Sequence, residues 1–399
     1  MNHNGFSHSG ELMKIWNSAA SASVVSLPIE KFVLWKKIKN RRRLLTVELE
    51  LTARCNNNCR HCCINLSAGD SRAKKAELTF DEIKKIVDEA ASLGTLWFLL
   101  TGGEPLLRED FLDIYLLLKR KGFLISIFTN ANLIAREHVE LFKKYPPRDI
   151  EITVYGVTQE TYERVTRKPG SFASFKRGLG LLSDGDLKVA LKAVALRSNA
   201  EELPGIFRFC REKTKDYFRF DPFLELRYDG DAVRNREIKS ERLSPEEIVA
   251  LEHSDPQRYG LLKKKCDELI IPELAHRTCN HLFHCGAGNG SASISSEGIF
   301  RLCGSLWHPD CVCDLRQGSL SEAWASFVPR VREIRSDNPD FLKKCRVCAI
   351  RNLCMWCPGR AHLETGELDR WVDYFCEVAH SRKEALLENG IKQNEPKMS

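Results

Sequence analysis

The sequence lacks the features that mark membrane-bound, exported and repetitive proteins. No stretch approaches the roughly 18 consecutive apolar residues that a membrane-spanning helix needs. Residues 1–25 do not place a basic segment before an apolar core, as an export signal does. No repeat of fixed period and no low-complexity tract occurs, and 43% apolar against 29% charged residues is an ordinary globular composition. We therefore expect a soluble, cytoplasmic protein with no membrane contact.

A strong excess of either charge is missing as well. The 61 Lys and Arg residues against 54 Asp and Glu residues give a net charge of +7, spread over 399 residues. Proteins that bind nucleic acids concentrate positive charge on one face. The one basic run, from Lys36 to Arg43, is typical of a solvated segment. The sequence therefore predicts no nucleic-acid partner, and docking of an acidic partner or peptide on this run stays open.

Cysteine, by contrast, is abundant, with 16 residues in the chain. In a reducing cytoplasm disulfides are disfavoured, so clustered cysteines more often hold metal or take part in chemistry. The spacing of the cysteines therefore becomes the main guide to function.

From residue 44 onward, strand and helix patterns alternate. Residues 45–51 alternate apolar and polar side chains with period two, which is typical of a strand. Thr79 and Glu82 then have the spacing of a capping box at the start of a helix. Further strands are predicted over residues 96–100, 124–128, 150–154, 188–196 and 218–226, and helices over 111–118, 136–144, 171–182 and 203–213. This alternation predicts an α/β fold with repeated βα units around a parallel sheet or barrel.

The same patterns divide the chain into five parts. Residues 1–43 are expected to form an extension with one helix near 31–39, and residues 44–230 the barrel core. Residues 231–275 are expected to form a helical linker, in which Ser244 and Pro245 begin a helix. A cysteine-rich, loop-rich domain over 276–385 and a frayed tail over 386–399 complete the prediction.

The first cysteine cluster lies just past the first strand, where active sites of βα barrels occur. Cys55, Cys59 and Cys62 are separated by three and two residues. Three thiolates in one loop suit three irons of a [4Fe–4S] cluster and leave the fourth iron open to another ligand. A structural zinc site normally has paired C-x2-C knuckles instead. Cys63 is interpreted as a buried thiol whose side chain points away from that of Cys62.

Here the sequence resembles the radical S-adenosylmethionine (SAM) enzymes, whose signature is C-x3-C-x2-C after the first strand of a partial barrel. His61 stands before the third cysteine, as it often does in that family. Gly102, Gly103, Glu104 and Pro105 follow the next strand and look like the family's GGEP motif, which gathers the SAM amino group. Glycines allow close backbone approach to a ligand, and a carboxylate can accept hydrogen bonds from an ammonium group. The resemblance implies a partial (β/α)6 barrel of the TIM type.

Two further strand ends match the family more loosely. Asn130 ends the third strand, where the family often has Thr-Asn-Gly. Thr153 ends the fourth strand, where a Ser or Thr commonly meets the SAM ribose or carboxylate. Many relatives then have an Asp before the next glycine, where this chain has Tyr155. The resemblance thus implies SAM contacts at Asn130 and Thr153.

The second cysteine field lies near the C-terminus, and its C-x2-C pairs taken alone are typical of zinc knuckles. Taken together, the series resembles the SPASM extension of radical SAM enzymes, with one departure, x2 instead of x3 in the last pair. The resemblance implies two auxiliary [4Fe–4S] clusters, one held by Cys279, Cys285, Cys303 and Cys357, and the other by Cys345, Cys348, Cys354 and Cys376. With three clusters bound, the net charge falls to about +2.

The resemblance implies that an electron from the first cluster cleaves SAM reductively to a 5′-deoxyadenosyl radical, which abstracts hydrogen from a substrate. Auxiliary clusters suit a net oxidation, so the leading hypothesis is oxidation or crosslinking of a ribosomally made peptide. Oxidation of a carbohydrate or other small metabolite stays open. Sulfatase maturation is disfavoured, because enzymes of that group typically have an Asp base after the cysteine matched by Cys303, where this chain has Gly304.

Several partners follow from this hypothesis. The resemblance implies an electron donor such as ferredoxin or flavodoxin. The 43-residue extension is too short for a fused leader-peptide recognition domain, so a peptide substrate calls for a separate recognition protein or direct docking. A hypothesis from another class, a non-catalytic adaptor that binds zinc and nucleic acid, leaves the three-cysteine loop unexplained.

Overall fold

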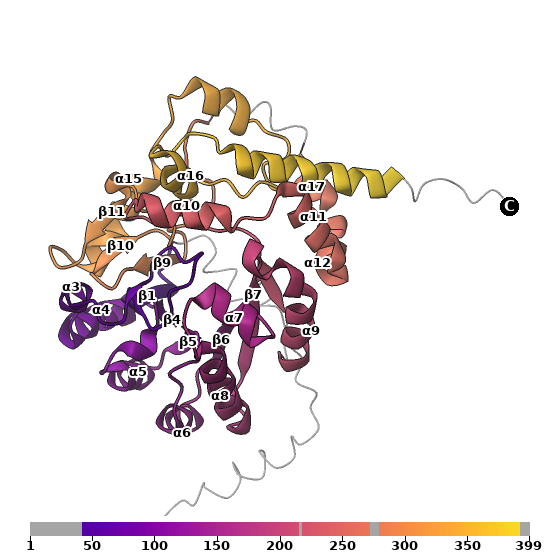
Figure 1. The fold of residues 1–399 in the computed structure, drawn as a ribbon. Helices are drawn as coiled ribbons and strands as arrows, with labels where there is room; N and C mark the ends of the chain where they lie inside the picture. Colours follow the sequence, from indigo (N-terminus) through magenta and orange to yellow (C-terminus); the bar gives the residue numbers. More distant parts are fainter. Residues whose placement is uncertain (1–41, 215–217, 272–278, 392–399) are drawn as a thin grey trace, which may run out of the picture. The chain divides into compact units, whose positions relative to one another are not determined.

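The structure is a computed structural model that describes residues 42–214, 218–271 and 279–391 (Figure 1). From Arg43 onward the chain belongs to one unit. The helix predicted near residues 31–39 and the basic run up to residue 41 lie outside the described residues. No helix in the described ranges has the length and apolar character that crossing a membrane requires.

A parallel sheet forms the centre of this unit. Six strands run parallel and follow one another across the sheet in chain order, and helices connect each strand to the next (Figure 1). This arrangement confirms the predicted partial barrel of βα units. The strands are β1 (Thr46–Thr52), β4 (Trp97–Gly102), β5 (Leu124–Thr129), β6 (Asp149–Val154), β7 (Val189–Val194) and β8 (Arg219–Asp221). The helices are α4 (Phe80–Ser92), α5 (Phe111–Arg120), α6 (Arg136–Lys144), α8 (Ser171–Asp184) and α9 (Leu203–Lys213), with two further helices, α3 (Ser71–Ala76) and α7 (Gln159–Thr166), that the sequence analysis did not predict.

The cysteine-rich region adds three short strands to the same sheet. β9 (Ser291–Ile294) pairs parallel with β1, and β10 (Ile299–Arg301) and β11 (Val312–Asp314) continue outward in antiparallel order. The sequence analysis expected a loop-rich region here, because three or four residues are too few for a clear period-two pattern. The domain division at residues 230 and 275 stays a prediction, and the sheet itself continues across it.

Helices cover the rest of the C-terminal half, including the segment predicted to be a helical linker. The predicted helix start at Ser244 is confirmed, since Ser244 and Glu247 form a capping box with Pro245 in the first turn. The last helix continues to Ile391, six residues into the segment that was predicted to fray. The helices are α10 (Ala232–Ser240), α11 (Pro245–Ser254), α12 (Pro256–Lys264), α13 (Cys266–Leu269), α14 (Leu320–Glu322), α15 (Val328–Arg332), α16 (Pro358–Thr365) and α17 (Asp373–Ile391).

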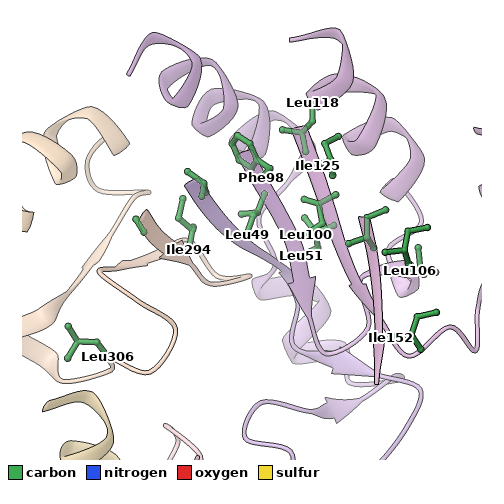
Figure 2. Packing of buried hydrophobic residues seen from close by; sticks show 14 of the residues in the cluster. Leu49, Leu51, Phe98, Leu100, Leu106, Leu118, Ile125, Ile152, Ile294 and Leu306 are labelled. Carbon is green, nitrogen blue, oxygen red and sulfur yellow. The ribbon is translucent and has the colours of Figure 1, made fainter. Parts of the chain in front are cut away.

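The core lies between the sheet and its helices (Figure 2). The period-two pattern of β1 places Leu49 and Leu51 in this core, and Phe98 and Leu100 of β4 pack beside them. Local signals fix the helices around this core. At α4, for example, the predicted capping box is confirmed, with the Thr79 N–H donating to the Glu82 carboxylate over 2.7 Å.

The opposite face of β1 carries carboxylates instead. Glu50 accepts a 2.6 Å hydrogen bond from Nη2 of Arg301 in β10, which also donates to the Ser293 hydroxyl over 3.0 Å. Arg301 is completely buried, and its guanidinium lies 3.6 Å from the centre of the Trp307 ring. This buried ion pair joins the first barrel strand to the cysteine-rich region.

Glu50→Gln is therefore expected to destabilise the fold, because it leaves the Arg301 charge buried without a carboxylate. Breaking one partner of a buried pair costs about 3 kcal/mol of unfolding free energy or more. Chemical denaturation of the anaerobically purified protein measures the loss. Glu109→Gln is the matched control, since its pair with Lys74 is exposed, and it should leave the denaturation midpoint unchanged. Equal effects of the two variants would contradict this assignment.

Candidate active site and cysteine clusters

The first cysteine cluster sits on a loop at the C-terminal end of β1. Cys55 ends β2 (Arg54–Cys55), which pairs with β3 (Leu66–Ser67), and the loop between these short strands carries Cys59 and Cys62. Two backbone N–H groups of this loop donate to carbonyls at the end of α7. The loop is therefore anchored on both sides before any ligand binds.

A cavity of about 530 Å³ lies beside these thiols, at the edge of the sheet where active sites of parallel barrels form. Residues of β4, β5, β6, β7 and β8 line it together with the cysteine loop. The predicted site residues that line it are Cys55, Cys59, Cys62, Gly102, Gly103, Asn130 and Thr153.

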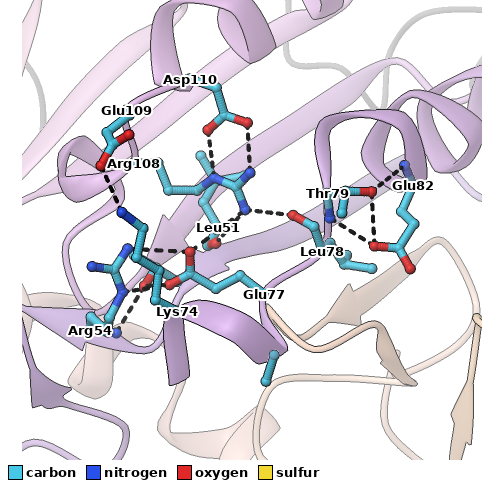
Figure 3. Close-up of polar contacts among 12 residues, drawn as sticks. Leu51, Arg54, Lys74, Glu77, Leu78, Thr79, Glu82, Arg108, Glu109 and Asp110 are labelled. Atoms are coloured by element: carbon cyan, nitrogen blue, oxygen red, sulfur yellow. Dashed lines mark hydrogen bonds and ion pairs between the residues drawn. The ribbon is translucent and has the colours of Figure 1, made fainter. Parts of the chain in front are cut away.

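A polar network supports the base of the cysteine loop (Figure 3). Arg54, the residue before Cys55, forms a bidentate pair with Glu77 at 2.7 and 3.2 Å, and both side chains are buried. Arg108 forms a second bidentate pair with Asp110 at 2.8 and 2.7 Å. Bidentate guanidinium pairs fix orientation as well as distance, so the network sets the direction in which the loop leaves the sheet.

The two glycines after β4 allow two backbones to meet. Gly102 has a φ of +127°, and a Cβ there would lie 2.2 Å from the carbonyl oxygen of Thr52. A Cβ on Gly103 would lie 2.3 Å from the carbonyl oxygen of Arg54. The Gly103 N–H donates to the Thr52 carbonyl over 2.7 Å. Any side chain at either position would push the motif away from the cysteine loop.

Glu104 lies buried beneath the cavity lining. Its side chain is completely buried and accepts hydrogen bonds from the Thr129 hydroxyl at 2.8 Å, the Asn130 N–H at 2.7 Å and the Leu106 N–H at 3.2 Å. Burial raises the pKa of Glu104 to about 7 although these donors lower it. Neither Glu104 nor Pro105 lines the cavity. The carboxylate thus joins the ends of β4 and β5 through the protein's own donors, and its contact with the SAM amino group stays a prediction.

Asn130 lines the cavity, and its side chain is bonded to the cysteine loop. Its amide Nδ2 donates to Oδ1 of Asn56 at 2.7 Å and lies 3.7 Å from the sulfur of Cys55. Its Oδ1 accepts from the N–H of Asn132, whose own amide donates to Asn57 at 3.0 Å. Asn130 therefore positions the loop, a role that the predicted SAM contact did not include.

The three loop thiols are the predicted ligands of a [4Fe–4S] cluster, and two of them, those of Cys55 and Cys59, are buried. Burial raises the pKa of Cys55 to about 12 and that of Cys59 well above its usual value. A positively charged metal centre favours the thiolate form of such buried cysteines. Within the described ranges, no three His, Cys, Asp or Glu side chains form a group that could hold a metal ion.

Two neighbours of this loop were interpreted from sequence. Cys63 is a partly buried residue, and burial of its thiol raises the pKa well above the usual value. Cys62 and Cys63 both line this cavity, and the different direction of their side chains stays a prediction. His61 also lines it, 5.2 Å from the ring of Tyr155, and burial, followed by the charges of Arg234 and Lys192, lowers its pKa to about 4. His61 is therefore a neutral side chain in this loop.

The C-terminal cysteines surround a second cavity of about 760 Å³. Its lining includes Cys285, Cys345, Cys348, Cys354, Cys357 and Cys376. Burial raises the pKa of Cys345 to about 12, and the neighbouring Cys354, Cys376 and Cys348 raise it further. These four thiols, which the sequence analysis assigned to one auxiliary cluster, therefore lie close enough to influence one another.

The other predicted set is partly assembled. Burial raises the pKa of Cys303 to about 12, and the nearby thiols of Cys357 and Cys285 raise it further. Cys279, the fourth member, is exposed, and its sulfur contacts Nδ1 of His281 at 2.8 Å. The structure thus brings three of these four cysteines together, and places Cys279 beside a histidine instead.

Charged residues that the sequence analysis missed also line the first cavity. Glu225 accepts hydrogen bonds from the Ser305 hydroxyl at 2.7 Å and from Nε of Arg360 at 3.0 Å. Arg360 follows Cys357 by three residues, so this contact links the first cavity to the second cysteine field. Lys192 lies in β7, and its only signal in the sequence was one charge within an apolar strand.

Comparison with known proteins agrees with this geometry. The family model described as "Radical SAM superfamily" matches residues 49–210. An AdoMet-dependent heme synthase from Methanosarcina barkeri is 28% identical over 80% of this chain and 92% of its own length. A Fe-coproporphyrin III synthase from the same organism is 30% identical over 76% of this chain and 80% of its own length. Among solved structures, Streptococcus suis SuiB bound to its precursor peptide SuiA has a TM-score of 0.63 at 16% identity, covering 92% of this chain and 87% of that one.

Asn130→Ala is expected to lower the midpoint potential of the [4Fe–4S] cluster that the loop is predicted to hold. The variant removes the amide donor near the Cys55 sulfur, and hydrogen bonds to cluster sulfurs stabilise the more negative reduced state. A redox titration followed by electron paramagnetic resonance of the anaerobically reconstituted protein measures the shift.

Asn132→Ala is the control for this experiment. It removes a bond to the same loop, through Asn57, without touching a sulfur. Its potential should stay at the wild-type value, with iron content checked in both variants. An equal shift in both variants would mean that loop position, and not the amide donor, sets the potential.

Proposed function

Because the chain belongs to the radical SAM superfamily, we propose that it is an oxidoreductase that cleaves SAM and abstracts hydrogen from a ribosomally made peptide. The observation that carries the SAM chemistry is the shared cavity. Three loop thiols, the Gly102–Gly103 turn and Thr153 all face it. Cys55, Cys59 and Cys62 would hold a [4Fe–4S] cluster, which when bound would supply the electron for SAM cleavage.

The protein's own residues position the reactants and exclude water. The Gly102–Gly103 turn lets backbone approach a ligand closely, and Asn130 holds the cysteine loop against the end of β5. The neutral ring of His61 and the ring of Tyr155 lie side by side in the lining of the cavity. These features support a site that is formed before its ligands bind.

The proposal of a net oxidation rests on the second cysteine field. One set of four neighbouring thiols and one set of three would hold auxiliary clusters, which would give the site acceptors for the electron released in a net oxidation. Cys357, in the set of three, lies three residues before Arg360, and Arg360 donates a hydrogen bond to Glu225 in the lining of the first cavity. This continuity favours an electron path from substrate to the auxiliary clusters, and Cys279 is proposed as the remaining ligand.

A peptide substrate is supported by the likeness in fold to SuiB, whose structure was solved with a precursor peptide. The identity of the sequence relatives favours a second candidate. Two of them are named for the synthesis of heme and Fe-coproporphyrin III, and this chain covers most of their length. Oxidation of a porphyrin side chain is therefore the alternative within the small-metabolite class.

Cys59→Ala is expected to abolish 5′-deoxyadenosine formation from SAM and dithionite, since it removes one of three ligands of the SAM-binding cluster. Cys313→Ala is the matched control, because Cys313 lies in β11 outside both proposed cluster sets, and it should keep wild-type turnover. Liquid chromatography with mass detection measures the product. Retained cleavage in a Cys59 variant that has lost this cluster would overturn the assignment.

Iron analysis distinguishes the cluster and zinc hypotheses for the second field. Anaerobically reconstituted protein should contain about twelve irons with equivalent sulfide, as three [4Fe–4S] clusters require. About four irons together with bound zinc would show that the C-terminal cysteines form knuckles instead.

Substrate class is decided by anaerobic turnover with two probes, peptides encoded beside the gene and Fe-coproporphyrin III. The peptide hypothesis expects a peptide that loses two hydrogen atoms while 5′-deoxyadenosine forms in equal amount. A mass change of the porphyrin with unmodified peptides would favour the second candidate and overturn the first.

A further inference from the structure

The cysteine loop is bonded to helix α10, which lies beyond the residues that the family model matches. Arg234 of α10 donates through Nη2 to the carbonyl of Cys59 and to Oδ1 of Asn65, both over 3.0 Å. The carbonyl of Cys59 also accepts the N–H of Cys62 over 3.3 Å. Arg234 therefore contacts a peptide group that links two predicted cluster ligands. Through Asn65, the last residue before β3, it also holds the far end of the same loop.

A second helix, α7, holds the residues on either side of Cys59. The N–H of Asn58 donates to the carbonyl of Thr166 over 2.9 Å, and the N–H of Arg60 donates to the carbonyl of Val165 over 3.2 Å. The backbone is thus bonded at three consecutive residues, with Cys59 in the middle. The contacts from α7 are made by backbone groups, whereas the contact from α10 is made by a side chain that a substitution can remove.

A carboxylate joins the two helices. Glu237 of α10 accepts hydrogen bonds from Arg167, the residue after α7, at 2.7 and 3.0 Å, and from Nη1 of Arg234 at 3.1 Å. Both terminal nitrogens of Arg234 therefore have acceptors, and 16% of its side chain is exposed. Because a guanidinium is planar, contacts on both nitrogens fix its direction as well as its position.

We propose that Arg234 is a positioning residue that keeps a [4Fe–4S] cluster on the loop of Cys55, Cys59 and Cys62. The inference rests on the proposed function, which assigns this cluster to the loop. A cluster with three protein thiolates depends on the position of each one, so movement of Cys59 would release iron. The charge of Arg234 has a separate effect. Reduction adds negative charge to a cluster, and a nearby cation favours the reduced state. The segment predicted to be a linker thus serves the first cysteine site.

The test measures how long the cluster survives in the anaerobically reconstituted holoprotein after a ferrous chelator, bathophenanthroline disulfonate, is added. Samples are reduced and frozen at intervals. The electron paramagnetic resonance signal that changes when SAM is added reports this cluster separately from the auxiliary clusters. Arg234→Met should shorten the lifetime of this signal about 10- to 100-fold, the range of one hydrogen bond to a charged group. The signals of the auxiliary clusters should decay at the wild-type rate.

Two further variants separate position from charge. Arg236→Met is the matched control, because it removes the same side chain from an exposed position on the same helix, and it should keep the wild-type lifetime. Arg234→Lys keeps the charge, but an ammonium group cannot replace a planar guanidinium. Its midpoint potential in a redox titration should stay near wild type while the lifetime falls, whereas Arg234→Met should lower both.

Three results would overturn the proposal. They are a wild-type lifetime in Arg234→Met, an equal loss in Arg236→Met, and equal loss of all cluster signals in both Arg234 variants, which would show general unfolding. Wild-type holoprotein without any signal that responds to SAM would instead overturn the proposed function.

Discussion

The candidate site depends on one buried carboxylate, that of Glu104. It accepts donors from its own turn and from the end of β5, and the end of β5 in turn holds the cysteine loop through Asn130. The ends of β4 and β5 and the cysteine loop are thereby joined without any ligand. Burial favours the neutral form of the Glu104 carboxyl, and these hydrogen bonds favour its charged form. Loss of one donor would therefore leave a buried carboxylate without one of its partners, so the residues that supply the donors tolerate few substitutions. Cofactor binding can then use a loop whose position is already set.

The barrel could be predicted from sequence because its signals are local. The capping residues Thr79 and Ser244 each act within one helical turn, and β1 alternates over seven residues. Strands β9 and β10 could not be predicted, since each has three or four residues and depends on partners that are distant in sequence. Their pairing is a tertiary effect that no short window contains.

The candidate site likewise has features that could be predicted from sequence and features that could not. The cysteine loop and the two glycines could be found by spacing, and the structure places them on one cavity. The direction of the Glu104 side chain could not be predicted, because a motif gives residue order and not the partners that compete for a carboxylate. The grouping of the late cysteines came from a resemblance to a family. Spacing alone would have paired Cys354 with Cys357, whereas their thiols influence different neighbours.

The pairing of β1 with both β4 and β9 has a consequence for how the two halves of the chain relate. A strand that is bonded along both edges cannot shift by one residue without exchanging its buried and cavity-facing side chains. The C-terminal region therefore fixes the height of the cysteine loop above the sheet. Without β9, β1 would expose an open edge suited to pairing with another chain. The region that carries the late cysteines thus contributes to the strand register on which the position of the cysteine loop depends.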